Sequence, residues 1–224
     1  MQQYKIVPPA KGKCGTAVPA PAAPTDVTNS MDGVDDITAP ITGGLLTIAK
    51  TDKITSALRG FLERAFPAGS LKISEKPVPV SKLVDGSTVL EGPLAIFARL
   101  TPGLMGRTAL EKAVVQQWCG FALSKELANA PSQLSPAKLE VFKAANDQLA
   151  DRCFFVGNAI TLADLFVWAA ADSWLRPCPG SLREMPYVIN VTRWFQHVQY
   201  TRGLCAKSAL FTICNNAINL PGAH

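Results

Sequence analysis

Apolar residues between positions 43 and 66 follow first the short run of a buried strand and then the spacing of a helix. Leu45-Leu46-Thr47-Ile48-Ala49 comes directly after Gly43-Gly44 and predicts a short strand. From 52 to 66 the apolar residues recur three or four positions apart, and Pro67 and Gly69 follow. We therefore expect one helix over 52–66.

Alternating polar and apolar residues predict further strands over 71–73, 82–84 and 88–90. Asp85-Gly86 stands between the last two and predicts the turn of a β-hairpin. Gly92-Pro93 then opens an apolar segment that ends at Leu100, and proline suits the first turn of a helix because that turn needs no N–H there. The expected order over 41–101 is β-α-β-β-β-α.

The remainder of the chain, from 106 to 224, has the apolar spacing of helices. Two capping boxes mark helix starts, Thr108 with Glu111 and Thr161 with Asp164. In each box the hydroxyl and the carboxylate satisfy backbone N–H groups that have no partner inside the helix. Ser135-Pro136 predicts another start, with an N-cap followed by a first-turn proline.

A late helix is expected over 190–200. Its apolar stripe comprises Val191, Trp194, Phe195 and Val198. The same spacing places Arg193, Gln196 and His197 on the outward side. The four tryptophans of the chain all fall in apolar helical stripes, which favours core packing over a platform for stacking bases.

Residues 1–40 contain six prolines and no periodic apolar pattern. Such a segment buries too little to offset the entropy of ordering, so we expect a disordered tail. Two interpretations stay open at this point. The tail is a solvated linker, or Tyr4-Lys5-Ile6-Val7 adds a strand to the sheet edge of a partner.

Composition excludes several function classes. The 224 residues are 48% hydrophobic, as expected of a folded domain. Their net charge of +5 indicates only a mild preference for anionic partners. Of the two histidines, His224 is the last residue, so a histidine triad or metal site would depend on His197 alone. The six cysteines form no CxxC pair, which indicates reduced thiols. We expect no metal, cofactor, signal peptide or membrane span.

The order of elements and one segment resemble the glutathione-transferase family. Residues 155–164, Phe-Val-Gly-Asn-Ala-Ile-Thr-Leu-Ala-Asp, resemble the signature of that family's helical domain. Residues 108–118 and 187–199 resemble helices of the elongation factor 1-epsilon family, which are transferase-like scaffolds of the multi-aminoacyl-tRNA-synthetase complex. The resemblance implies a degenerate thioredoxin-like domain at 41–101 and a helical domain at 106–224, preceded by the tail.

The transferase resemblance can be checked at the positions that would hold glutathione. Thr51 stands where the family has Tyr, Ser or Cys to activate the thiol. Pro79 matches the proline that, with a cis bond, holds the backbone of glutathione. The family has Glu or Gln followed by Ser at the position of Glu91-Gly92. Gly92 stands in place of the serine, so the hydroxyl that would bind the γ-glutamyl carboxylate of glutathione is absent. The sequence therefore predicts no catalytic residue.

The resemblance implies a non-catalytic scaffold in the cytoplasm, with the nucleus as a second location. Its expected partners are aminoacyl-tRNA synthetases or auxiliary proteins with similar domains, joined in a hetero-oligomer. In the resembling proteins the position of Arg193 lies in such an interface, and Gln196 and His197 are expected to belong to it. The alternative is that Arg193 is exposed and contacts only solvent. Basic residues over 50–82 favour weak contact with tRNA or form a solvated face. The alternatives are a glutathione transferase and a subunit of the elongation factor 1 complex.

Overall fold

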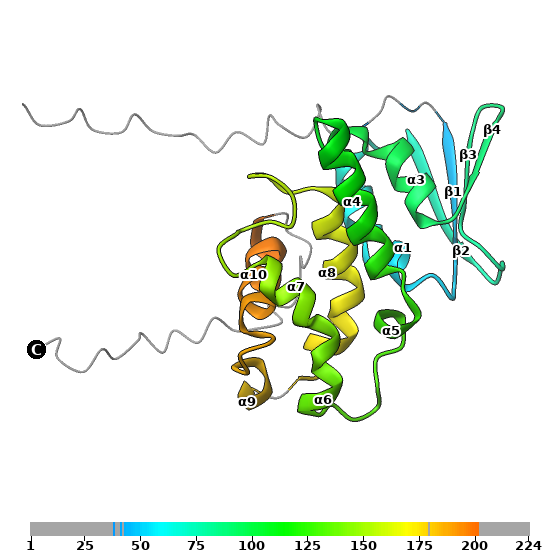
Figure 1. Ribbon diagram of the computed structural model, residues 1–224. Helices are drawn as coiled ribbons and strands as arrows, with labels where there is room; N and C mark the ends of the chain where they lie inside the picture. Colours follow the sequence, from blue (N-terminus) through cyan, green and yellow to red (C-terminus); the bar gives the residue numbers. More distant parts are fainter. Residues whose placement is uncertain (1–37, 39–40, 42, 179, 202–224) are drawn as a thin grey trace, which may run out of the picture. The chain divides into compact units, whose positions relative to one another are not determined.

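The computed structural model describes residues 38, 41, 43–178 and 180–201, which form a small mixed sheet followed by helices (Figure 1). The tail predicted at 1–40 lies outside these residues except for Thr38, and so does the chain after 201. Within the described part, the sheet half ends near residue 105 and the helical half begins at Ala109. The boundaries 41–101 and 106–224 agree with this change but stay predictions.

The sheet half has the predicted order of elements, except that two helices stand in place of the first one. Its strands are ordered β2-β1-β3-β4, with β1 parallel to β2 and the other pairs antiparallel. Leu46 and Leu83, which are neighbours in this sheet, are fully buried against the helices. The elements are β1 (Gly44–Ala49), α1 (Lys53–Ala57), α2 (Arg59–Ala65), β2 (Leu71–Lys76), β3 (Lys82–Asp85), β4 (Thr88–Glu91), α3 (Pro93–Leu100) and η1 (Pro102–Met105).

The single helix predicted over 52–66 is wrong, because two helices, α1 and α2, occupy this range. They meet at Leu58, whose φ of −90° and ψ of 1° depart from helical values. Gly60 follows two residues later, and glycine is a weak helix former. Leu58 is nevertheless fully buried, so the apolar spacing correctly predicted which face packs inward.

The helical half contains every helix start that the sequence predicted. Its elements are α4 (Ala109–Ala122), α5 (Lys125–Ala128), α6 (Pro136–Leu139), η2 (Glu140–Phe142), α7 (Lys143–Gln148), α8 (Leu162–Leu175), α9 (Gly180–Arg183) and α10 (Ile189–Thr201). Ser135 precedes α6, but its hydroxyl makes no capping bond. Its carbonyl accepts the N–H groups of Lys138 and Leu139 instead.

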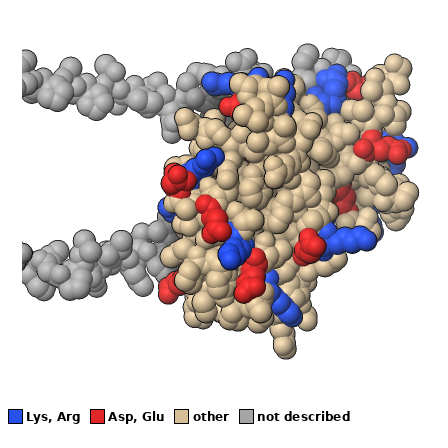
Figure 2. Space-filling model, viewed as in Figure 1, with Lys and Arg blue, Asp and Glu red and all other residues tan. Residues whose placement is uncertain are grey.

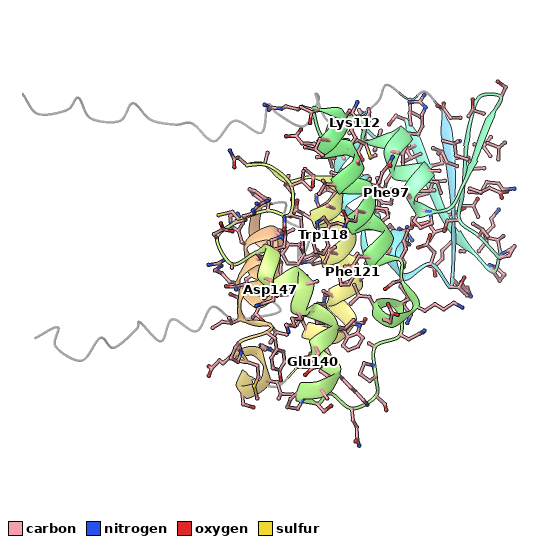
Figure 3. The ribbon with its side chains drawn as sticks, viewed as in Figure 1. Phe97, Lys112, Trp118, Phe121, Glu140 and Asp147 are labelled. Atoms are coloured by element: carbon pink, nitrogen blue, oxygen red, sulfur yellow. The ribbon has the colours of Figure 1, made fainter. Side chains whose placement is uncertain are left out.

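Helix α8 passes through the centre of the helical half and is buried on nearly every side. The large aromatic residues gather around it, as Figure 3 shows for Trp118 and Phe121 on the neighbouring α4. Trp168, Trp174 and Trp194 are each less than 5% exposed. Trp118 is half-buried and lies 4.5 Å, centroid to centroid, from Phe155. The prediction that the tryptophans pack in the core is confirmed.

Candidate functional site

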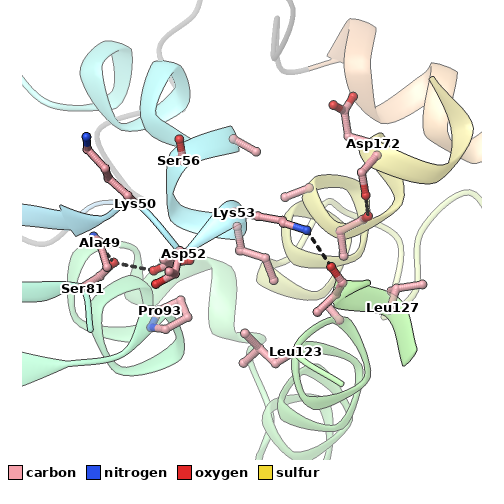
Figure 4. A pocket seen from close by; sticks show the side chains of 18 of the residues that line it. Ala49, Lys50, Asp52, Lys53, Ser56, Ser81, Pro93, Leu123, Leu127 and Asp172 are labelled. Atoms are coloured by element: carbon pink, nitrogen blue, oxygen red, sulfur yellow. Dashed lines mark hydrogen bonds between the residues drawn. The ribbon is translucent and has the colours of Figure 1, made fainter. Parts of the chain in front are cut away.

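A cavity of about 660 Å³ lies between the sheet half and the helical half. The end of β1, the start of α1 and the segment before β3 form one wall, and α4, α5 and α8 form the other. Leu123 and Val80 line the cavity and are 39% and 43% exposed. Figure 4 shows Asp52, Lys53 and Ser81 at the wall formed by the sheet half.

Asp52 is the charged group at the start of α1, and sequence reasoning missed it. One of its carboxylate oxygens accepts the Thr55 N–H at 3.0 Å, which makes Asp52 the N-cap. The other accepts the hydroxyls of Thr55 at 2.6 Å and of Ser81 at 2.5 Å. Ser81 also accepts the Ala49 N–H at 3.0 Å and is 1% exposed. A negative charge therefore occupies the helix N-terminus, the position that favours anions.

Lys53 joins the two halves across the cavity. Its ammonium group donates to the Ala128 carbonyl, at the end of α5, at 3.0 Å (Figure 4). The two residues are 75 positions apart in the chain, so no local pattern could predict the contact. Because the last carbonyls of a helix lack partners within it, a cation there is favourable.

Two of the four predicted glutathione-site residues line the cavity and two do not. Thr51 and Pro79 are on its wall, together with Pro93. Glu91 instead forms an ion pair with Lys82 at 2.7 Å, and Gly92 donates its N–H to the Ser81 carbonyl. The cis bond implied for Pro79 is wrong, because every described peptide bond is trans. The trans form is the default for X–Pro bonds, favoured by about 0.5–1 kcal/mol.

The predicted capping pair Thr161 and Asp164 lies at the buried start of α8. Asp164 is 0% exposed, and its carboxylate accepts the N–H groups of Phe155 and Thr161 at 3.0 and 2.9 Å. It also accepts the Thr161 hydroxyl at 3.0 Å and the indole N–H of Trp194 at 2.9 Å. Burial raises the pKa of the Asp164 carboxyl, and these hydrogen bonds oppose the rise. This pair is structural.

The other predicted box, at the start of α4, is exposed. The Glu111 N–H donates to the Thr108 hydroxyl at 3.1 Å. The Glu111 carboxylate in turn accepts the N–H groups of Arg107 and Thr108 at 2.7 and 3.1 Å. The bond from Arg107 has the largest effect and, with that from Thr108, lowers the pKa of Glu111. Both capping predictions are confirmed.

The three residues predicted to point outward from α10 have different surroundings. Arg193 is exposed, and its Nη2 donates to the Leu149 carbonyl at 2.6 Å and lies 3.5 Å from the Arg152 carbonyl. The His197 ring lies 5.3 Å, centroid to centroid, from Phe154, whereas Gln196 is half-buried. A guanidinium has five N–H donors, so Arg193 can hold the 149–152 segment and also meet a partner.

The described residues also bear on metal binding and on membrane insertion. They contain no cluster of three or more His, Cys, Asp or Glu side chains suited to a metal ion. No helix among them is long and apolar enough to cross a membrane.

The chain resembles known proteins both in its helical half and in its fold. The family model for the glutathione S-transferase C-terminal domain matches residues 114–199. This match spans most of the helical half and is a similarity to that domain family. The matched residues contain α8 with its Asp164 cap and most of α10 with Arg193.

Relatives of the chain are translation proteins. Mouse eukaryotic translation elongation factor 1 epsilon-1 is 29% identical over 131 residues, which are 56% of this chain and 72% of that protein. Elongation factor 1-gamma of Artemia salina is 28% identical over 200 residues, 81% of this chain and 44% of that protein. The tRNA-aminoacylation cofactor arc1 of Schizosaccharomyces pombe is 28% identical over 137 residues, 58% of this chain and 28% of that protein.

Solved structures show the same fold. A theta class glutathione S-transferase from Xanthomonas axonopodis pv. citri, with glutathione bound, matches with a TM-score of 0.54 and 18% identity. The match covers 76% of this chain and all of that one. The chain therefore has a glutathione S-transferase-like fold, as the sequence predicted.

Proposed function

We propose that this protein is a non-catalytic scaffold that assembles aminoacyl-tRNA synthetases, or auxiliary proteins with similar domains, by pairing of glutathione S-transferase C-terminal domains. The names of its relatives carry the proposal, since they are elongation factor 1 proteins and a tRNA-aminoacylation cofactor. The similarity to the transferase from Xanthomonas, at 18% identity, is one of fold alone.

The residues at the predicted glutathione site favour a protein that does not activate thiols. Asp52 places a carboxylate at the N-terminus of α1, beside Thr51. A thiolate bound there would meet this negative charge, which raises the pKa of a nearby thiol. Glu91 is held by Lys82, and Gly92 offers no hydroxyl. These residues favour a pseudo-enzyme, whose role depends on its surfaces.

Two separate faces suit a scaffold. The first is formed by α3 and the beginning of α4, where Leu110 is 75% exposed and Ala95 is also exposed. Figure 2 shows charged side chains along the upper edge of the view, near the start of α4, and a mostly uncharged region below them. The second face is the outward side of α10, with Arg193, Gln196 and His197. Because the faces lie on different helices, one chain can hold two partners at once.

Arg193 is the residue on which the second face depends. It combines an exposed position with bonds that fix the 149–152 segment, so its guanidinium is held in place before a partner arrives. Planar, pre-ordered arginines at the centre of an interface are typical hot spots, whose truncation costs about 2 kcal/mol or more of binding free energy.

Affinity purification from cells, followed by mass spectrometry, tests the proposal. We expect synthetases to co-purify with the tagged full chain. Arg193→Ala should weaken one partner at least about tenfold, because 1.4 kcal/mol is a factor of ten, and leave the partner on the α3/α4 face unchanged. Arg176→Ala, which removes an exposed arginine paired with Asp172, is the matched control. Equal recovery from wild type and Arg193→Ala would show that the second face lies elsewhere.

A second candidate function is supported by the names of two relatives, elongation factor 1 epsilon-1 and elongation factor 1-gamma. In that case the chain would be a subunit of an elongation factor 1 complex, held through the same type of domain pairing. The same purification separates the two candidates, because it would recover elongation factor subunits in place of synthetases.

A further inference from the structure

The cavity between the two halves has the size and the lining of a small-molecule site. Its volume of about 660 Å³ lies within the range of about 300–1,000 Å³ that is typical of ligand pockets. Twelve of its 21 lining residues are Ala, Pro, Val, Leu or Ile, so a ligand that fills it has an apolar body. Val80 and Leu123 line the cavity and are themselves partly exposed, so it opens to solvent.

Asp52 is the acidic residue of this lining that has no counter-ion. Among the described residues, no Lys, Arg or His side chain forms an ion pair with it. The other acid at the cavity, Asp172, differs in this respect. Arg176 donates to both of its carboxylate oxygens, at 2.7 and 3.2 Å. The charge of Asp172 is therefore balanced within the protein, whereas that of Asp52 is available to a ligand.

Two lysines also line the cavity, but neither is directed at Asp52. The Lys53 ammonium group donates to the Ala128 carbonyl on the opposite wall, at 3.0 Å. In Figure 4 the side chain of Lys50 extends away from Asp52. The sheet-half wall of the cavity therefore presents a carboxylate that neither lysine neutralises.

The carboxylate of Asp52 is held in one orientation and can accept one more hydrogen bond. A carboxylate has about four acceptor positions. Oδ2 accepts the hydroxyls of Thr55 and Ser81, and Oδ1 accepts the Thr55 N–H. All three donors are neutral, so a cationic donor at Oδ1 would add a bond and balance the charge. Because Asp52 is half-buried, solvent and salt screen such a pair less than they screen a pair on the surface.

We propose that this cavity binds a small organic cation, an apolar molecule with a primary ammonium group. The ammonium group donates to Oδ1 of Asp52, and the apolar part lies against the alanines and prolines of the wall. Glutathione does not fit this arrangement, because it is an anion whose thiolate would approach the same carboxylate. The proposal concerns the isolated chain and goes beyond the scaffold role, so either can fail without the other.

NMR titrations of the full chain with three probes test the charge selectivity. Hexylamine, 1-hexanol and hexanoate share one linear alkyl chain and differ in the charge of the end group. We expect the amide signals of cavity residues such as Lys53 and Leu123 to shift. Hexylamine should bind at least about fivefold more tightly than 1-hexanol, and hexanoate should bind most weakly. Added salt should reduce the preference for hexylamine.

Three variants locate the selectivity. Asp52→Asn removes the charge and keeps a good N-cap residue, so hexylamine should then bind no more tightly than 1-hexanol. Ala57→Leu enlarges an exposed side chain of the wall and should weaken the binding of all three probes. Asp147→Asn removes an exposed carboxylate on α7, outside the cavity lining, and should have no effect.

Three results would overturn the proposal. The first is that no probe shifts the signals of the cavity residues. The second is that hexanoate binds there as tightly as hexylamine. The third is that the preference for hexylamine persists in Asp52→Asn, with thermal unfolding showing that the variant folds. If Asp52→Asn does not fold, the salt titration of the wild type decides, since a preference that salt does not reduce is not due to charge.

Discussion

The indole N–H of Trp194 in α10 donates to the buried carboxylate of Asp164 in α8, across 2.9 Å. The same carboxylate binds the backbone of Phe155 and Thr161. A buried carboxylate is tolerated only when hydrogen bonds replace the water it has lost. Asp164 therefore ties the start of α8, the segment before it and α10 into one unit. The proposed interface helix depends on this unit for its position.

Thr161→Ala should lower the free energy of unfolding by about 1 kcal/mol, and by no more than about 2. The variant removes the hydroxyl that donates to Asp164 at 3.0 Å and leaves the backbone bond in place. Chemical denaturation of both proteins measures the difference. Thr88→Ala on the exposed strand β4 is the control. An unchanged midpoint for Thr161→Ala would show that this residue is not the cap of α8.

The chain should not conjugate glutathione. The Asp52 carboxylate occupies the start of α1, and neither Tyr, Cys nor Ser stands at the position of Thr51. We expect no retention on glutathione-agarose and no turnover of a chromogenic electrophile above the uncatalysed rate. An active theta class transferase serves as the positive control. Turnover that vanishes in Thr51→Val would contradict the pseudo-enzyme proposal and favour a transferase.

The three described cysteines should differ sharply in reactivity. Burial, with a smaller effect from Asp164, raises the pKa of Cys119 to about 12. At pH 8 only about one thiol in ten thousand would then be ionised, and the thiolate is the reactive form. Burial also raises the pKa of Cys178, whereas Cys153 is exposed. Peptide mapping after brief alkylation of the folded protein should find Cys153 modified before Cys119 and Cys178. Equal labelling of Cys119 would contradict its buried position.

Glu111 should make stability depend on pH in a defined direction. Backbone hydrogen bonds, that from Arg107 first, lower its pKa in the folded protein. A carboxyl with a lowered folded pKa stabilises above its unfolded pKa, and this contribution is lost as pH falls through the folded value. The stability advantage of wild type over Glu111→Gln should therefore shrink below about pH 4. Chemical denaturation at several pH values measures the stability difference between the two proteins. Asp164 is present in both, so its contribution cancels in this difference. A constant difference would contradict the capping role.

Local signals in the sequence determined most of the secondary structure. Each capping box consists of residues three positions apart, so its hydrogen bonds need only one helical turn to form. Asp85-Gly86 and Gly92-Pro93 act over similarly short distances, and the hairpin and α3 lie where they predict. The same locality explains the error over 52–66. Apolar spacing continues through Leu58, but the helix there depends on how α1 and α2 pack.

The tertiary structure alone decided which residues meet at the cavity and on α10. Asp52 binds Ser81 from 29 positions away, and Lys53 reaches Ala128 from 75. Arg193 donates a hydrogen bond to the Leu149 carbonyl, 44 positions earlier in the chain. Alternation along β1 separates Leu45 from Leu46, but which of the two is buried depends on the side of the sheet that the helices cover. Such contacts form between groups that share no local pattern, and only folding brings them within hydrogen-bond distance.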